Sequence, residues 1–129
     1  MQLRRGNNAI EFALILPVLL TLIFGAMEYS WYFVQWEAVV RATSVGVRAG
    51  SQLKRTGTPS PTSTAVTVAK STLTTSFPAI GNASTVTCTT PGNNTVQCTL
   101  TTPYTPLIRY LPTPTNLVYT ASMRLEDPT

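Results

Sequence analysis

The side chains that could perform chemistry are few in this chain of 129 residues. It contains no histidine, and its acids and cysteines are Glu11, Glu28, Glu37, Cys88, Cys98, Glu126 and Asp127. Hydrolytic triads, paired catalytic acids, zinc sites and phosphate-binding glycine loops each need residues or spacings that this set does not supply. A Ser–Lys pair through Lys54 or Lys70 is the one catalytic arrangement left open. We therefore expect a protein that is not an enzyme and that uses no cofactor or metal.

The two cysteines lie in a pattern typical of a β-hairpin. Residues 85–90 and 95–100 largely alternate polar and apolar side chains, and Pro91-Gly92-Asn93-Asn94 between them is rich in turn-forming residues. If Cys88 faces Cys98, the apolar side chains of both strands share one face. The other facing pairs in this register are Val86 with Leu100 and Thr90 with Val96. We predict a hairpin closed by a Cys88–Cys98 disulfide, in a compartment that permits oxidation.

Glu11 stands at the start of the longest apolar stretch of the chain. Phe12 to Met27 carries no charged residue, and a helix from Ala9 to Met27 would rise about 28 Å, close to the thickness of a bilayer core. Arg4 and Arg5 precede this stretch, so the positive-inside rule places the N-terminus in the cytoplasm and the remainder outside it. A carboxylate at the edge of hydrocarbon is costly and usually has a partner, although the headgroup layer can also hold it.

The helical pattern continues well beyond the length that a membrane needs. No turn signal occurs before Gly57 and Pro59, so we predict a helix over residues 7–55 with a transmembrane segment at about residues 9–28. Pro17 removes a backbone donor, which predicts a kink or a local loss of helix near it.

Three small residues recur at every fourth position of this helix. Ala42, Gly46 and Gly50 would leave one face without bulk, so that another backbone could approach closely. The approaching backbone could belong to a neighbouring subunit or to the chain's own small domain.

The remaining residues, 56–129, are rich in threonine and proline and predict a small β domain. Residues 61–77 have helical spacing with Thr62 or Ser63 as a cap, although two short strands are an alternative. Residues 102–115 contain too many prolines for a central strand and predict a loop. Residues 117–125 alternate as a strand that should join the hairpin. The predicted fold class is α+β, with a long N-terminal membrane-spanning helix, a second short helix and a small antiparallel sheet.

The formal net charge of +4 is modest, and two of the cations precede Gly6. Because this leaves little excess positive charge on the rest of the chain, no nucleic-acid partner is expected.

The N-terminal residues resemble a known family. Arg4-Arg5-Gly6, followed by Asn7 to Glu11, then Phe12 and Pro17, is similar to the start of the TadE-like pilins of the type IV and tight-adherence (Tad) pilus superfamily. The resemblance covers roughly Arg4 to Gly50. One departure is Asn7, which stands where many type IV pilins have an aromatic residue.

The resemblance implies a processing step and an assembly mechanism. Residues 1–6 would be a leader that prepilin peptidase removes by cutting between Gly6 and Asn7. Glu11 would then be the fifth residue of the mature chain and would pair with the new N-terminal amine of an adjacent subunit. The residues expected to act in assembly are Glu11, Phe12, Pro17, Ala42, Gly46 and Gly50.

We therefore expect a structural pilin or minor pilin that inserts in the cytoplasmic membrane, with its C-terminus outside the cytoplasm. Its partners would be prepilin peptidase, membrane lipid, and other copies of itself or other pilins in an extracellular filament used for adhesion or secretion. The alternative is an uncleaved, single-span, membrane-anchored binding protein that contacts a partner through the loop from Tyr104 to Leu111.

Overall fold

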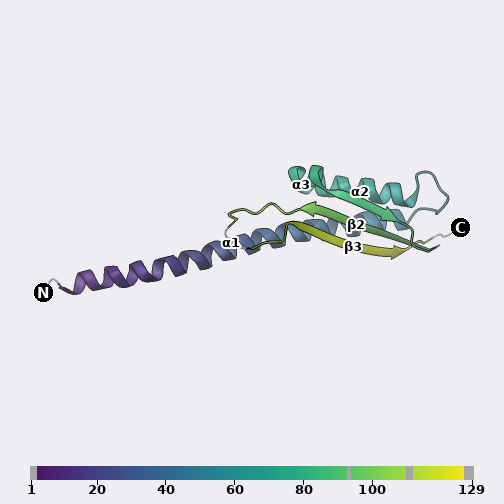
Figure 1. Ribbon diagram of the computed structural model, residues 1–129. Helices are drawn as coiled ribbons and strands as arrows, with labels where there is room; N and C mark the ends of the chain where they lie inside the picture. Colours follow the sequence, from purple (N-terminus) through teal and green to yellow (C-terminus); the bar gives the residue numbers. More distant parts are fainter. Residues whose placement is uncertain (1–2, 93, 110–111, 127–129) are drawn as a thin grey trace. The chain divides into compact units, whose positions relative to one another are not determined.

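The computed structural model describes residues 3–92, 94–109 and 112–126, and their side chains from Asn8 onward. The elements in chain order are α1 (Leu3–Ser51), α2 (Pro61–Ser76), α3 (Pro78–Ala83), β1 (Thr85–Thr89), β2 (Thr95–Pro103) and β3 (Asn116–Arg124) (Figure 1). The predicted α+β class is confirmed, with its long apolar helix, second short helix and three-stranded antiparallel sheet. Asn93 of the predicted turn and Tyr110 and Leu111 of the predicted loop lie outside the described residues.

Helix α1 is a single element of 49 residues. It begins before Gly6 and ends at Ser51, earlier than the predicted end at Arg55, because Leu53 N–H bonds to the Gly50 carbonyl at 3.2 Å and the chain turns. Of the kink or local loss of helix predicted near Pro17, the loss does not occur, because the helix is continuous from Leu3 to Ser51.

The chain divides into two compact units, and each is described by itself. The first contains Met1–Tyr32 and Pro106–Thr113, and the second contains Phe33–Thr105 and Pro114–Thr129. Helix α1 therefore contributes to both units.

Helix α2 confirms the helical alternative for the Thr-rich segment of the second unit. Its N-cap is Ser60, rather than the predicted Thr62 or Ser63, and the Ser60 hydroxyl accepts the Ser63 N–H at 3.2 Å. Threonine is a poor helix former, but here its hydroxyls bond to carbonyls four residues earlier, as from Thr72 to Val68 at 2.8 Å. The buried face consists of Pro61, Ala65, Ala69 and Leu73. Helix α3, which the sequence did not predict, follows directly.

The sheet has the strand order β1-β2-β3, with both pairs antiparallel (Figure 1). Val86 pairs with Leu100 and Cys88 with Cys98, as predicted, and the two sulfurs form a disulfide of 2.01 Å. The predicted pair of Thr90 with Val96 is not made, because β1 ends at Thr89.

Strand β2 extends to Pro103, into the segment predicted as a loop. The first residue of β1, Thr85, pairs with Thr101, so beyond that point β2 has a partner on one side only. Proline is tolerated there because its missing N–H can face the unpaired side. The loop accordingly begins at Tyr104, whose N–H bonds to the Thr115 carbonyl at 2.9 Å.

The core of the second unit joins α1, α2 and the sheet. It contains Val47 of α1, Ala65 of α2, Val96 and Cys98 of β2, and Leu125 after β3. The rings of Trp36 and Tyr119 add an edge-to-face contact at 5.9 Å between α1 and β3. Gln35 binds the backbone of Thr105 in both directions, donating to its carbonyl at 3.0 Å and accepting from its N–H at 3.5 Å.

Candidate assembly and membrane segment

Helix α1 is the one helix in the described part of the chain that is long and apolar enough to cross a membrane. Its most apolar window has a mean hydropathy of 2.3, and 0% of that window is buried within the protein. Soluble monomers rarely expose a continuous apolar surface of this extent. The exposed large side chains between Ile10 and Met27 therefore need lipid or other protein chains to cover them.

The residues predicted for processing and assembly lie at the start of this surface. Gly6 and Asn7 are both helical, and Glu11 and Phe12 follow on the same helix. Glu11 is exposed, as is Phe12, which is 61% accessible. The fold thus places a carboxylate beside exposed hydrocarbon.

Pro17 sits inside the exposed segment without ending the helix. Proline has no N–H, so the Ala13 carbonyl one turn earlier loses its usual helical donor. The Thr21 hydroxyl donates to the Pro17 carbonyl at 2.8 Å, which is a different acceptor.

The small residues predicted at every fourth position lie in the second unit, and the two glycines among them pack against α2. A Cβ on Gly46 would lie 2.6 Å from the Ala69 Cβ, and one on Gly50 would lie 2.6 Å from the Pro61 carbonyl oxygen. Ala42 is also fully buried. Of the two alternatives predicted for the small-residue face, the contacts therefore show packing against the chain's own domain. A role of this face in assembly stays a prediction.

Glu28 is a residue whose role the sequence did not predict. Its carboxylate is buried in the first unit, where it accepts the Leu107 N–H at 3.3 Å and the Ile108 N–H at 2.9 Å. The only feature of the sequence that singles out Glu28 is its position, because it is the first acid after the uncharged run that ends at Met27. Its partners, 79 and 80 residues further on, could not be read from that signal.

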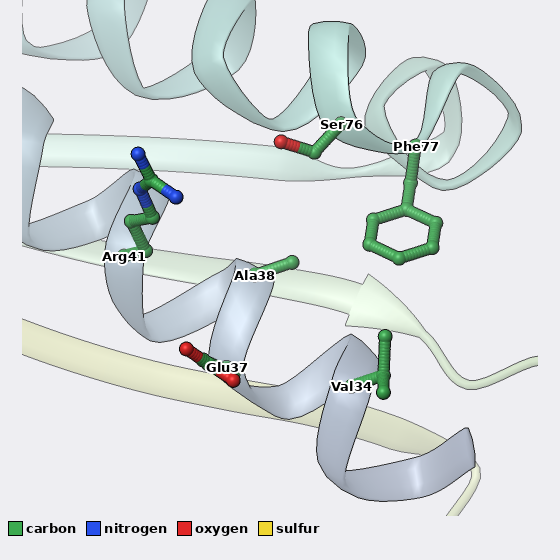
Figure 2. Close-up of a pocket in the computed structure, with 6 residues that line it drawn as sticks. All are labelled: Val34, Glu37, Ala38, Arg41, Ser76 and Phe77. Atoms are coloured by element: carbon green, nitrogen blue, oxygen red, sulfur yellow. The ribbon is translucent and has the colours of Figure 1, made fainter.

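A pocket of about 150 Å³ lies between α1 and the end of α2 in the second unit. Figure 2 shows the Arg41 guanidinium and the Ser76 hydroxyl toward one side and Val34 and Phe77 toward the other. Arg41 and Ser76 also line a neighbouring pocket of about 330 Å³ with further α2 hydroxyls. The Thr75 and Ser76 hydroxyls already donate to helix carbonyls, at 2.8 and 3.2 Å. The first pocket is also lined by Glu37, so the charged groups at these pockets are one cation and one carboxylate, beside hydroxyls that already donate to helix carbonyls.

The described residues contain no cluster of three or more histidine, cysteine, aspartate or glutamate side chains that could hold a metal ion. The chemistry that the fold displays is thus a disulfide, an exposed apolar helix and two carboxylates, Glu11 and Glu28, near the ends of its uncharged run.

Comparison with known proteins points to the same segment. Residues 6–48 match the model of a family described as TadE-like protein. No match was found among curated proteins or among solved structures. The predicted resemblance is thereby confirmed: residues 6–48 form a TadE-like segment, consistent with a TadE-like protein of the tight-adherence pilus.

Proposed function

We propose that the chain is a structural pilin or minor pilin, which inserts in the cytoplasmic membrane through α1 and then assembles into an extracellular filament for adhesion or secretion. One observation carries the proposal: the TadE-like match over residues 6–48 coincides with a helical surface whose apolar side chains are exposed. Lipid would cover that surface before assembly, and the α1 helices of neighbouring subunits would cover it afterwards. Such head-to-tail contacts are heterologous and generate an open helical polymer.

In this proposal prepilin peptidase cuts between Gly6 and Asn7. The new amine on Asn7 is a cation, and Glu11 is the fifth residue of the resulting chain. Removing either charge from water is costly, but an ammonium of one subunit and a carboxylate of the next would offset each other's desolvation. Glu11 is an exposed residue of α1, so a neighbouring subunit could approach it.

Replacing Glu11 tests the assembly step. We expect Glu11→Leu to enter the membrane as well as the natural chain, because it makes the helix more apolar, and to form few or no filaments, because the neighbour's amine loses its partner. Filaments are counted by electron microscopy and insertion is measured by carbonate extraction. Glu126→Leu, which removes an exposed acid after the sheet, is the matched control and should assemble normally. A normal filament yield from Glu11→Leu would refute the assembly role.

The processing step has its own test. Intact-mass measurement of filament subunits from native cells should give a chain that begins at Asn7. Subunits that retain Gly6 would contradict the proposed cut. A protein that keeps its leader and stays monomeric after detergent extraction would instead support a membrane-anchored binding protein.

A further inference from the structure

The loop that follows β2 groups with the apolar helix rather than with the sheet. Pro106–Thr113 and Met1–Tyr32 form one compact unit, and the Glu28 carboxylate joins them by accepting the N–H groups of Leu107 and Ile108. Glu28 itself is only 1% accessible. A buried carboxylate with two backbone donors is therefore used to hold this loop against the helix.

The two loop residues whose N–H groups bond to Glu28 carry apolar, exposed side chains. Leu107 is 54% and Ile108 is 38% exposed, whereas Tyr104, which begins the loop, is buried at 7%. The next residue, Arg109, is exposed and takes a left-handed backbone conformation with φ of 54°. The loop thus presents two apolar side chains followed by a cation.

Glu28 marks a particular depth on α1. It is the first residue after the uncharged run from Phe12 to Met27. If that run spans the hydrocarbon core, Glu28 lies where the core meets the outer headgroups. Tyr29, the next residue, is 56% exposed and is of the type that favours this layer.

We propose that the loop at Leu107 and Ile108 is a second membrane contact, which rests on the outer surface of the bilayer beside α1. This inference rests on the membrane insertion in the proposed function. The two apolar side chains enter the boundary between headgroups and acyl chains, and Arg109 faces the lipid phosphates. Non-helical backbone is costly near hydrocarbon unless its polar groups are satisfied, and Glu28 satisfies two N–H groups of the loop.

The test uses the full-length chain in vesicles of phosphatidylcholine and phosphatidylglycerol. Single cysteines are introduced by Leu107→Cys or Ile108→Cys and labelled with an environment-sensitive fluorophore, while Cys88 and Cys98 are protected by their disulfide. Lipids that carry a shallow nitroxide quencher report contact with the headgroup boundary. We expect both labels to lose as much fluorescence as a label at Tyr29→Cys, the reference for the interface.

Two further sites make the outcome decisive. Leu20→Cys, within the apolar run, reports membrane insertion by itself, and Ser122→Cys, exposed on β3, is the control that should not be quenched. A second set of lipids carries the nitroxide deep in the acyl chains and reports contact with the hydrocarbon core. If these lipids quench the label at Leu20 while the shallow quencher leaves the labels at Leu107 and Ile108 unaffected, the loop contact is overturned and insertion stands. No quenching at Leu20 would overturn insertion and the proposed function with it.

The role of Glu28 is tested with the same labels. Glu28→Leu removes the acceptors of the Leu107 and Ile108 N–H groups, so the label at Leu107 should lose its quenching while the label at Leu20 keeps it. Unchanged quenching at Leu107 would show that Glu28 does not hold the loop at the membrane. A Leu107 label that is unquenched in vesicles and becomes shielded from aqueous iodide only in filaments would identify another subunit as the partner, and would overturn the proposal.

Discussion

At the scale of single residues, the space between α1 and α2 at Gly46 is too small for a side chain. A Cβ there would lie 2.6 Å from the Ala69 Cβ and 2.7 Å from the Ala65 carbonyl oxygen. We expect Gly46→Val to lower the free energy of unfolding by roughly 1–3 kcal/mol, since overpacking forces neighbouring backbone to shift. The measurement is thermal or urea unfolding of the full chain in detergent, monitored by circular dichroism.

Ser44→Val is the matched control for Gly46→Val, because Ser44 is exposed two residues away on the same helix. A change of about 0.5 kcal/mol or less is expected at such a surface position. Equal stability of the two variants would show that α2 does not constrain the Gly46 face.

The sequence predicted some residue roles and left others open for a physical reason. The spacing of Ala42, Gly46 and Gly50 predicted a close backbone approach, but spacing on one helix does not identify the approaching chain. Glu28 was visible as an acid beyond an apolar run. Its function depends on two backbone N–H groups in a distant loop, and no local pattern encodes such a contact.

At the scale of elements, the hairpin was predictable in register because the cysteines and the alternating side chains agree on one face. Its ends were less predictable: β1 stops before Thr90, and β2 continues to Pro103. Strand β2 can include Pro103 because β1 begins to pair with it only at Thr101, so the proline has a partner strand on one side alone. That arrangement is a property of the sheet and cannot be read from the β2 sequence. The sequence of α2 left two short strands as an alternative because its threonines disfavour a helix. In the fold, its apolar face is buried and its threonine hydroxyls bond to carbonyls of the same helix, so packing decides for the helix.

The disulfide gives the prediction that belongs to this scale. Cys88 and Cys98 are separated by 10 residues, and a loop of about that length contributes roughly 2–3 kcal/mol by restricting the unfolded chain. Replacing both by alanine should lower the free energy of unfolding by about that amount, measured by urea titration in detergent. Thr85→Ala with Thr101→Ala, a facing pair of the same strands, is the control and should cost about 1 kcal/mol or less. Equal losses in the two double variants would contradict a specific role for the bridge.

At the scale of the whole molecule, the question is whether the exposed apolar part of α1 alone holds the chain in the membrane. Arginine near the centre of a spanning helix costs about 2.5–3.5 kcal/mol, and leucine contributes favourably, so Leu19→Arg with Leu20→Arg should oppose insertion by roughly 6–8 kcal/mol. We expect this double variant to leave the carbonate-resistant membrane fraction. Val118→Arg with Ser122→Arg adds the same charge to the exposed face of β3 and should leave the membrane fraction unchanged. If the helix variant stayed in the membrane as firmly as this control, an attachment other than α1 would be required, and assembly through α1 would have to be reconsidered. If it is lost while Glu11→Leu is retained, insertion belongs to the apolar run and assembly to the carboxylate at its start.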